Sequence, residues 1–105
     1  MTLQKQEHPA AFAELRDAAD WYEDQEPGLG EDFLDAVDSA VRQAAQWPGS
    51  APKMRNWDRD PEIRSMRVQV FPYRVLYCAT ETSLIVLAYA HIRRRPGYWH
   101  PRIAH

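Results

Sequence analysis

The hydrophobic period of this chain changes once, near residue 62, and that change most constrains its fold. Up to Trp47, apolar residues recur at helical spacing, whereas from Ile63 to His91 they alternate with polar residues as in strands. Helices followed by strands are typical of an α+β domain, here with a helical hairpin on one face of an antiparallel sheet. At 105 residues the chain has room for one core, so we expect a single domain over residues 1–105.

Two helices are expected in the first half of the chain. The first begins at Pro9, whose missing N–H costs nothing in a first turn, and ends before Pro27 and Gly28. The second runs from Leu29 to Trp47. Because the connection is short, the two helices should form an antiparallel hairpin. The expected buried stripes are Phe12, Leu15, Ala19 and Tyr22 on the first helix, and Phe33, Val37, Ala40, Val41 and Ala44 on the second.

A three-stranded meander is expected in the second half, after a loop at residues 48–61. Its strands should cover residues 63–70, 73–79 and 84–91. The last of these is apolar on both faces, which indicates a central position in the sheet. The polar stretch 2–7 is compatible with a short edge strand, although its pattern does not require one.

The formal net charge of −2 hides a strong asymmetry between the two halves of the sequence. Residues 1–50 hold eleven acidic and three basic side chains, a charge of −8, and residues 51–105 hold four and ten, a charge of +6. Such polarity predicts one electropositive face that attracts anionic partners. The alternative is that the helices carry acids and the strands carry arginines without functional meaning, and charge alone favours neither.

Composition limits the compartment and the chemistry. The opening MTLQKQEHP lacks the apolar core of a signal peptide, and the longest apolar run, residues 84–90, is too short to span a bilayer. The single cysteine, Cys78, excludes an internal disulfide and fits a reducing compartment. We therefore expect a soluble cytoplasmic protein. No pair of His, Cys or Asp has ligand spacing within a predicted element, so we expect no metal and no cofactor.

Three stretches together carry a family resemblance: WYEDQEPGLGEDFLDAVDSAV at 21–41, FPYRVLY at 71–77 and VLAYAHIRRRPGYW at 86–99. They combine a Trp-Tyr-Glu helix end, a Pro-Gly-Leu-Gly linker, Phe-Pro-Tyr-Arg between strands and a C-terminal His-x-Arg-Arg-x-Pro-x-Tyr-Trp pattern. With these motifs the chain resembles the RelE/ParE superfamily of type II toxin–antitoxin toxins over roughly residues 9–100. The linker and the tail are more similar to the ParE branch.

The resemblance implies a compact βααβββ toxin that a cognate antitoxin neutralises by wrapping an extended or helical segment around it. ParE-like members are associated with poisoning DNA gyrase, an action that consists of binding and needs no catalytic residue. RelE-like members are associated with cutting mRNA in the ribosomal A site. The gyrase reading is our leading hypothesis, and the alternatives are the nuclease or a degenerate toxin that only binds its antitoxin.

In the nuclease alternative, the resemblance implies that Arg67 and Arg74 bind the phosphate of the RNA and that His91 or Tyr98 transfers the proton. Metal-independent RNA cleavage must deprotonate a 2′-OH, stabilise a phosphorane and protonate the leaving oxygen. The planar guanidinium of arginine suits phosphate oxygens. Residues 62–70 contain no lysine and the chain is acidic overall, whereas a ribosome-binding nuclease gains from positive charge. These departures favour the ParE-like branch.

A basic face of the sheet is the expected binding surface for the target or the antitoxin. It would combine the arginines of the strands with the arginines and aromatic residues that follow the last strand. The candidate residues are Arg64, Arg67, Arg74, Arg93, Arg94, Arg95, Tyr98 and Trp99.

Several candidates also have a purely structural interpretation. Arg93–Arg95 could simply keep an exposed strand end solvated, and Trp99 is expected to cover the core. Tyr98 is balanced between the two roles, since its hydroxyl group favours contact with water. A lone strand histidine such as His91 is more often structural than catalytic.

Arg74 is the candidate with the most specific alternative. An arginine in the middle of a sheet is costly unless it is exposed or paired. It therefore marks either a functional face or an ion pair with Glu62 or Glu81.

Overall fold

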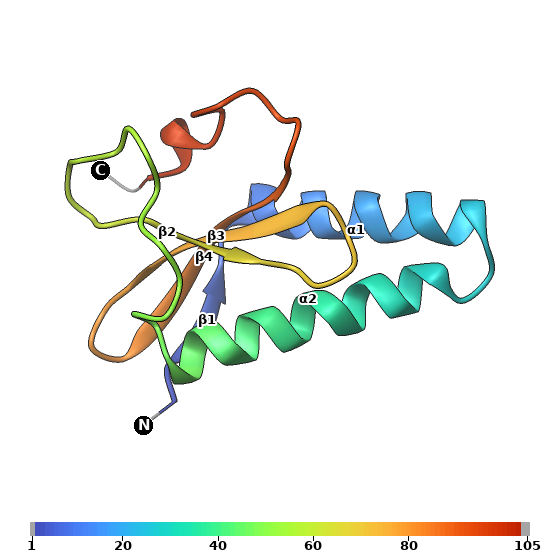
Figure 1. Cartoon of the computed structure of the whole chain (residues 1–105), viewed down its shortest axis with the longest axis horizontal. Helices are drawn as coiled ribbons and strands as arrows, with labels where there is room; N and C mark the ends of the chain where they lie inside the picture. The colour runs from blue at the N-terminus through green and yellow to red at the C-terminus, as the bar shows by residue number, and fades with distance from the viewer. Residues whose placement is uncertain (1, 104–105) are drawn as a thin grey trace.

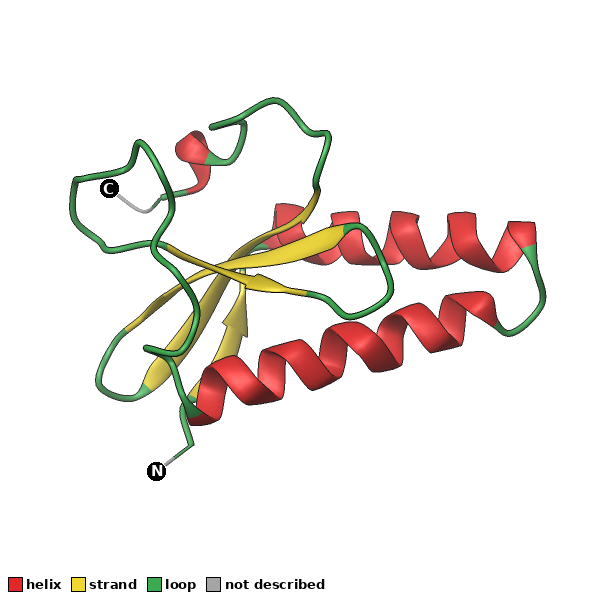
Figure 2. Cartoon of the chain, in the orientation of Figure 1, coloured by secondary structure: helices red, strands yellow, loops and turns green. Residues whose placement is uncertain are grey.

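Two long helices lie side by side across one face of a four-stranded sheet in a computed structural model that describes residues 2–103 (Figure 1). Long loops and a short C-terminal helical turn lie on the opposite side of the sheet (Figure 2). The expected α+β order βααβββ is confirmed. The elements are β1 (Gln4–Glu7), α1 (Pro9–Gln25), α2 (Leu29–Gln46), β2 (Arg64–Arg67), β3 (Tyr73–Ala79), β4 (Ser83–His91) and η1 (His100–Arg102).

The sheet is mixed, with strand order β1-β4-β3-β2. The central position expected for the last strand is confirmed, because β4 lies between β1 and β3. β2–β3 and β3–β4 are antiparallel, but β1 runs parallel to β4, so the expected all-antiparallel sheet is wrong at this edge. A parallel pair needs a long crossover connection, and α1, α2, β2 and β3 all lie between these two strands in the chain. No helix within residues 2–103 is long and apolar enough to cross a membrane.

The connection between the helices is closed by a carboxylate. Glu23 accepts hydrogen bonds from the backbone N–H groups of Gly28 and Gly30, at 3.0–3.1 Å, and so satisfies free donors at the start of α2. Gly28 has φ of +91°, a conformation that favours glycine. Gly30 has no room for a side chain, since a Cβ there would lie 2.6 Å from the Ala19 carbonyl oxygen. The Pro-Gly-Leu-Gly linker thus fixes how closely the helices approach.

The helical stripes were predicted well for one helix and less well for the other. All five stripe residues expected on α2 are buried. On α1 the buried face is centred on Ala11, Ala18 and Ala19, and Phe12 is 47% exposed beside Arg16. The expectation that Phe12 is a core residue is therefore wrong, because α1 turns its alanines toward the sheet and Phe12 toward solvent.

The strand expected at residues 63–70 is much shorter, since β2 ends at Arg67. Val68 is still buried and its N–H bonds the Tyr73 carbonyl, but the alternation breaks at Val70. Val70 is 93% exposed and has φ of +74°, so it cannot continue a strand. The turn into β3 therefore begins earlier than the pattern predicted.

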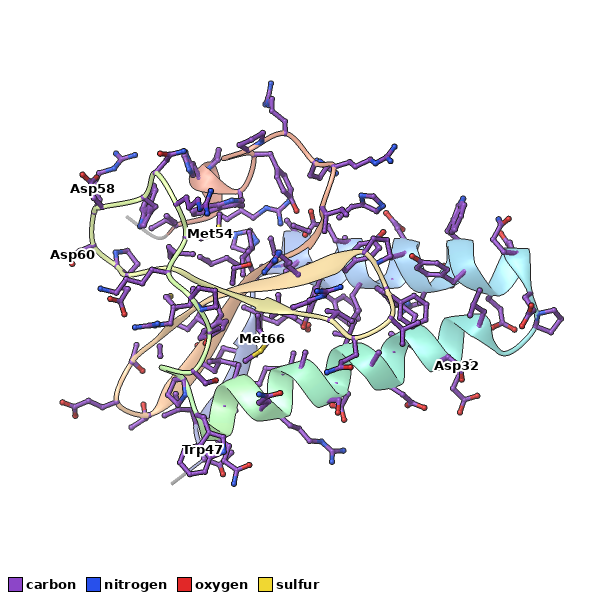
Figure 3. All side chains as sticks on the ribbon, viewed as in Figure 1. Asp32, Trp47, Met54, Asp58, Asp60 and Met66 are labelled. Atoms are coloured by element: carbon purple, nitrogen blue, oxygen red, sulfur yellow. The ribbon has the colours of Figure 1, made fainter. Side chains whose placement is uncertain are left out.

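The sheet is covered on both faces, by different kinds of structure. The helix side holds the larger core, which includes Phe33, Met66 and Tyr77. The other side is covered by the loop before β2 and by the tail after β4, with Met54 and Trp99 in a second, smaller core. Figure 3 shows Met66 on the helix side of the sheet and Met54 on the opposite side.

Candidate functional site

The tail after β4 is fastened to the rest of the molecule by one carboxylate, Glu14 of α1. Arg102 donates two hydrogen bonds to Glu14, at 2.7 and 3.1 Å, and the Tyr98 hydroxyl donates a third at 2.7 Å. The backbone N–H of Tyr89 donates to the same carboxylate at 3.1 Å. The ion pair is largely shielded from solvent, with side chains 14% and 16% exposed. We call Glu14, Tyr89, Tyr98 and Arg102 the Glu14 cluster.

Nothing in the sequence pattern predicts this role for Glu14. The reason for it lies in the sheet. β1 pairs with β4 only as far as Val86, so at Tyr89 the side of β4 that faces away from β3 has no strand beside it within residues 2–103. A buried backbone N–H must find another acceptor, and Glu14 supplies one. Glu14 and the Tyr89 N–H are close only in the folded structure, because they are far apart in the sequence.

Tyr98 is held in a way that opposes proton transfer. Burial raises the pKa of its phenol, and the hydrogen bond to Glu14 raises it further. Its ring is covered by two guanidinium groups, with Arg94 at 4.1 Å and Arg102 at 5.0 Å from the ring centre. Tyr98 therefore holds the tail in place, and its hydroxyl proton is donated to Glu14.

Arg64 lies apart from the other candidate arginines. Its register partner on β3 is Tyr77, which belongs to the helix-side core. Its guanidinium forms an ion pair with Glu62 at 3.1 Å and donates to the carbonyl oxygen of Ala51. Arg64 is thus already engaged in holding the preceding loop against the sheet edge.

Arg67 and Arg74 face each other across β2 and β3 as direct register partners. Arg74 donates a 3.3 Å hydrogen bond to the Ser65 hydroxyl, and Arg67 is exposed. Neither arginine forms an ion pair with an acid of residues 2–103; in particular, Arg74 is not paired with Glu62 or Glu81. Like charges placed directly opposite each other are destabilising. An anion bound between the two guanidinium groups would relieve this repulsion.

The arginines of the tail are also free of ion pairs within the described part of the chain. Arg93, Arg94 and Arg95 are all exposed and none of them pairs with an acid there. Arg94 and Arg95 share a hollow of about 200 Å³ with Arg74, where β4 ends and β3 begins. The structure therefore brings Arg74 together with Arg94 and Arg95.

His91 and Trp99 are mainly engaged within the fold. His91 Nδ1 accepts the backbone N–H of Arg93 at 3.1 Å, and its ring packs edge-on against Tyr73 at 5.2 Å. Trp99 is 2% exposed and packs against Trp57, with ring centres 5.3 Å apart. Trp99 therefore covers the second core, which leaves the arginines as the accessible part of this surface.

The chemistry of the site is that of an anion-binding surface. Its accessible groups are guanidinium side chains, which are suited to carboxylates and phosphates. Among residues 2–103 no three His, Cys, Asp or Glu side chains lie close enough together to hold a metal ion.

The fold and the site define a class of protein: a small α+β domain with a helical hairpin on one face of the sheet and a tail that displays exposed arginines. The sequence profile of the family described as "ParE toxin of type II toxin–antitoxin system, parDE" matches residues 7–96. The chain therefore belongs to the ParE toxin family, and the resemblance to the RelE/ParE superfamily is confirmed. A comparison with curated proteins found no match.

Proposed function

We propose that the whole chain acts as one cytoplasmic toxin domain that binds and inhibits DNA gyrase until a cognate antitoxin neutralises it. Membership of the ParE family makes it a type II toxin with an antitoxin partner. The observation that carries the proposal is a group of arginines without ion pairs among residues 2–103: the half-buried Arg74 and the exposed Arg93–Arg95. Beside them, the Tyr98 proton is held by Glu14, so binding is better supported than catalysis.

Inhibition of gyrase supercoiling in vitro tests this proposal. The purified chain, freed of antitoxin, should inhibit supercoiling at micromolar concentration, and adding antitoxin should restore it. Replacing Arg93, Arg94 and Arg95 by alanine should weaken inhibition, whereas Arg42→Ala on α2 should not. Undisturbed supercoiling at micromolar excess of the wild-type chain would refute the gyrase target.

A ribosome-dependent mRNA endonuclease is the second candidate. It is favoured by one observation: Arg67 and Arg74 are direct register partners on neighbouring strands, and guanidinium groups suit phosphate oxygens. His91 would then carry the proton, since Tyr98 is engaged with Glu14. Primer extension on translated mRNA after induction separates the candidates. Discrete A-site cuts that disappear in Arg74→Ala would establish the nuclease and exclude a purely gyrase-binding toxin.

The antitoxin should present an acidic, amphipathic segment to the sheet and the helical hairpin. Charge complementarity with the arginines gives specificity and a fast encounter more than raw affinity. Apolar anchors should therefore supply most of the binding free energy, about 2 kcal/mol or more for each hot-spot residue. A chain that binds antitoxin tightly but causes no growth arrest on induction would be the degenerate toxin.

A further inference from the structure

The turn between β2 and β3 exposes an apolar residue, Val70, in an unfavourable backbone conformation. Val70 is 93% exposed and has φ of +74°. Positive φ is a true outlier for a β-branched residue, because its Cβ crowds the backbone. An exposed valine gains no burial in return. Backbone strain of this kind persists only where the surrounding structure imposes it, and it gathers at binding sites.

The surrounding structure does hold this turn firmly. Phe71 packs edge-on against Tyr22 of α1 and Phe33 of α2, with ring centres 4.9 and 5.2 Å apart. The N–H of Val68 bonds the carbonyl of Tyr73 at 3.0 Å and closes the turn. In Figure 1 the turn reaches back over the helical hairpin. The backbone on either side of Val70 is therefore held in place.

A second exposed apolar residue lies beside the turn. Ile92 follows β4, is 61% exposed, and its N–H bonds the Pro72 carbonyl at 3.0 Å. Val70 and Ile92 line one hollow of about 470 Å³ together with Arg67 and Arg74. Three locally unfavourable features thus meet at one place: a strained valine, an exposed isoleucine and two facing arginines without an ion pair among residues 2–103.

We infer that this hollow is a two-part docking site for an acidic segment of the cognate antitoxin. An aliphatic or aromatic side chain of that segment packs on Val70 and Ile92, while a neighbouring carboxylate bridges Arg67 and Arg74. The inference rests on the proposed function only for the identity of the partner. A nucleic acid would use the arginines but leave the two aliphatic residues in water, so a peptide fits the site better. The antitoxin is the occupant because membership of the family supplies that partner.

The substitution Val70→Gly distinguishes an effect on antitoxin binding from an effect on the stability of the fold. Glycine adopts positive φ without strain and removes no buried surface here, so the thermal unfolding midpoint of the free chain should rise or stay unchanged. The affinity for copurified antitoxin, measured by calorimetry, should nevertheless fall at least tenfold because the apolar contact is lost. Gln69→Ala, next to it in the same turn, should change neither quantity.

The double variant Arg67→Gln with Arg74→Gln tests the carboxylate-binding half of the site. Antitoxin affinity should fall at least tenfold at low salt, and the loss should shrink as salt rises. Arg16→Gln with Arg42→Gln on the helical hairpin removes the same charge and should alter affinity less than twofold.

Antitoxin affinity within twofold of wild type in both Val70→Gly and the Arg67/Arg74 variant would overturn the inference. The same result with lost inhibition of gyrase, or lost binding to a single-stranded RNA oligonucleotide, would also overturn it and would assign the hollow to that other partner. Failure of the wild-type chain to inhibit gyrase would refute the proposed target while leaving the antitoxin affinities as a separate readout.

Discussion

The two faces of the sheet are built on different principles. The helix face is closed by periodic apolar residues, and its centre, with Phe33 and Tyr77, is fully buried. The tail face is closed by irregular segments that Trp99 and the Glu14 cluster hold in place. The arginines that form no ion pair within residues 2–103 lie along the tail face and at its border. The helix face therefore acts as the scaffold, and the tail face positions the groups available to a partner.

Loss of a central side chain on the helix face should have the largest effect on stability. Phe33→Ala removes a fully buried ring that packs against Tyr22, Phe71 and Tyr73. The free energy of unfolding of this variant, measured by urea denaturation, should be about 3–5 kcal/mol lower than that of the wild type. The control Leu34→Ala, at a neighbouring position that is 38% exposed, should cost far less. Equal losses in the two variants would contradict the scaffold role of this face.

Glu14→Gln should cost about 3 kcal/mol, because it leaves the shielded guanidinium of Arg102 without its counterion. Unlike Phe33→Ala, this change should act locally. Hydrogen exchange should speed up in residues 92–103 while α2 keeps its protection. Asp17→Asn, an exposed acid one turn further along α1, is the control and should leave the tail protected. Uniform loss of protection across the chain would show that the tail is not a separate unit.

Tyr98→Phe removes one hydrogen bond to a charged group and should cost about 1.5 kcal/mol at pH 7. The folded pKa of Tyr98 is raised above its ordinary value of 10.0, chiefly by burial. A raised pKa adds stability below the unfolded pKa, and this contribution is lost as the pH rises past it. The difference between wild type and variant should therefore shrink above about pH 10. A difference that stays constant or grows between pH 9 and 11 would contradict this account of Tyr98.

Glu62→Gln, at an exposed position just before β2 at the edge of the sheet, should have the smallest effect. A hydrogen bond from Lys53 lowers the pKa of Glu62 below its ordinary value of 4.5, with help from the charge of Arg64. A lowered pKa gives stability that is present above pH 4.5 and is lost as the pH falls through the folded pKa. The variant should therefore differ slightly from wild type at pH 7 and not at pH 3. Glu81→Gln, without an ion pair among residues 2–103, should match wild type at both values.

The scaffold could be predicted because its sequence signals are local. The change of period, the α2 stripe and the Pro-Gly breakers each act within a few residues, and the structure confirms them. Phe12 was assigned wrongly because its exposure depends on how closely α1 approaches the sheet. The direction of β1 was assigned wrongly because it depends on a pairing more than 70 residues apart in sequence.

The tail face could be predicted only in part. Its arginines were recognised from the sequence, but the separation of Arg64 from Arg67 depends on which face of β2 each side chain occupies. The contacts of Glu14 and the exposed, positive-φ conformation of Val70 were missed entirely. One depends on where β1 stops pairing with β4, and the other on a backbone conformation that valine rarely adopts.

The measurement that tests the central contrast most directly is the association rate with antitoxin at increasing salt. The wild-type rate should fall steeply with salt, since exposed charges are screened beyond about 8–10 Å near physiological ionic strength. Replacing Arg93, Arg94 and Arg95 by alanine should slow association at low salt and flatten this dependence, with circular dichroism and the unfolding midpoint unchanged. A triple variant that associates at the wild-type rate at every salt concentration would contradict the claim that the tail arginines guide the partner.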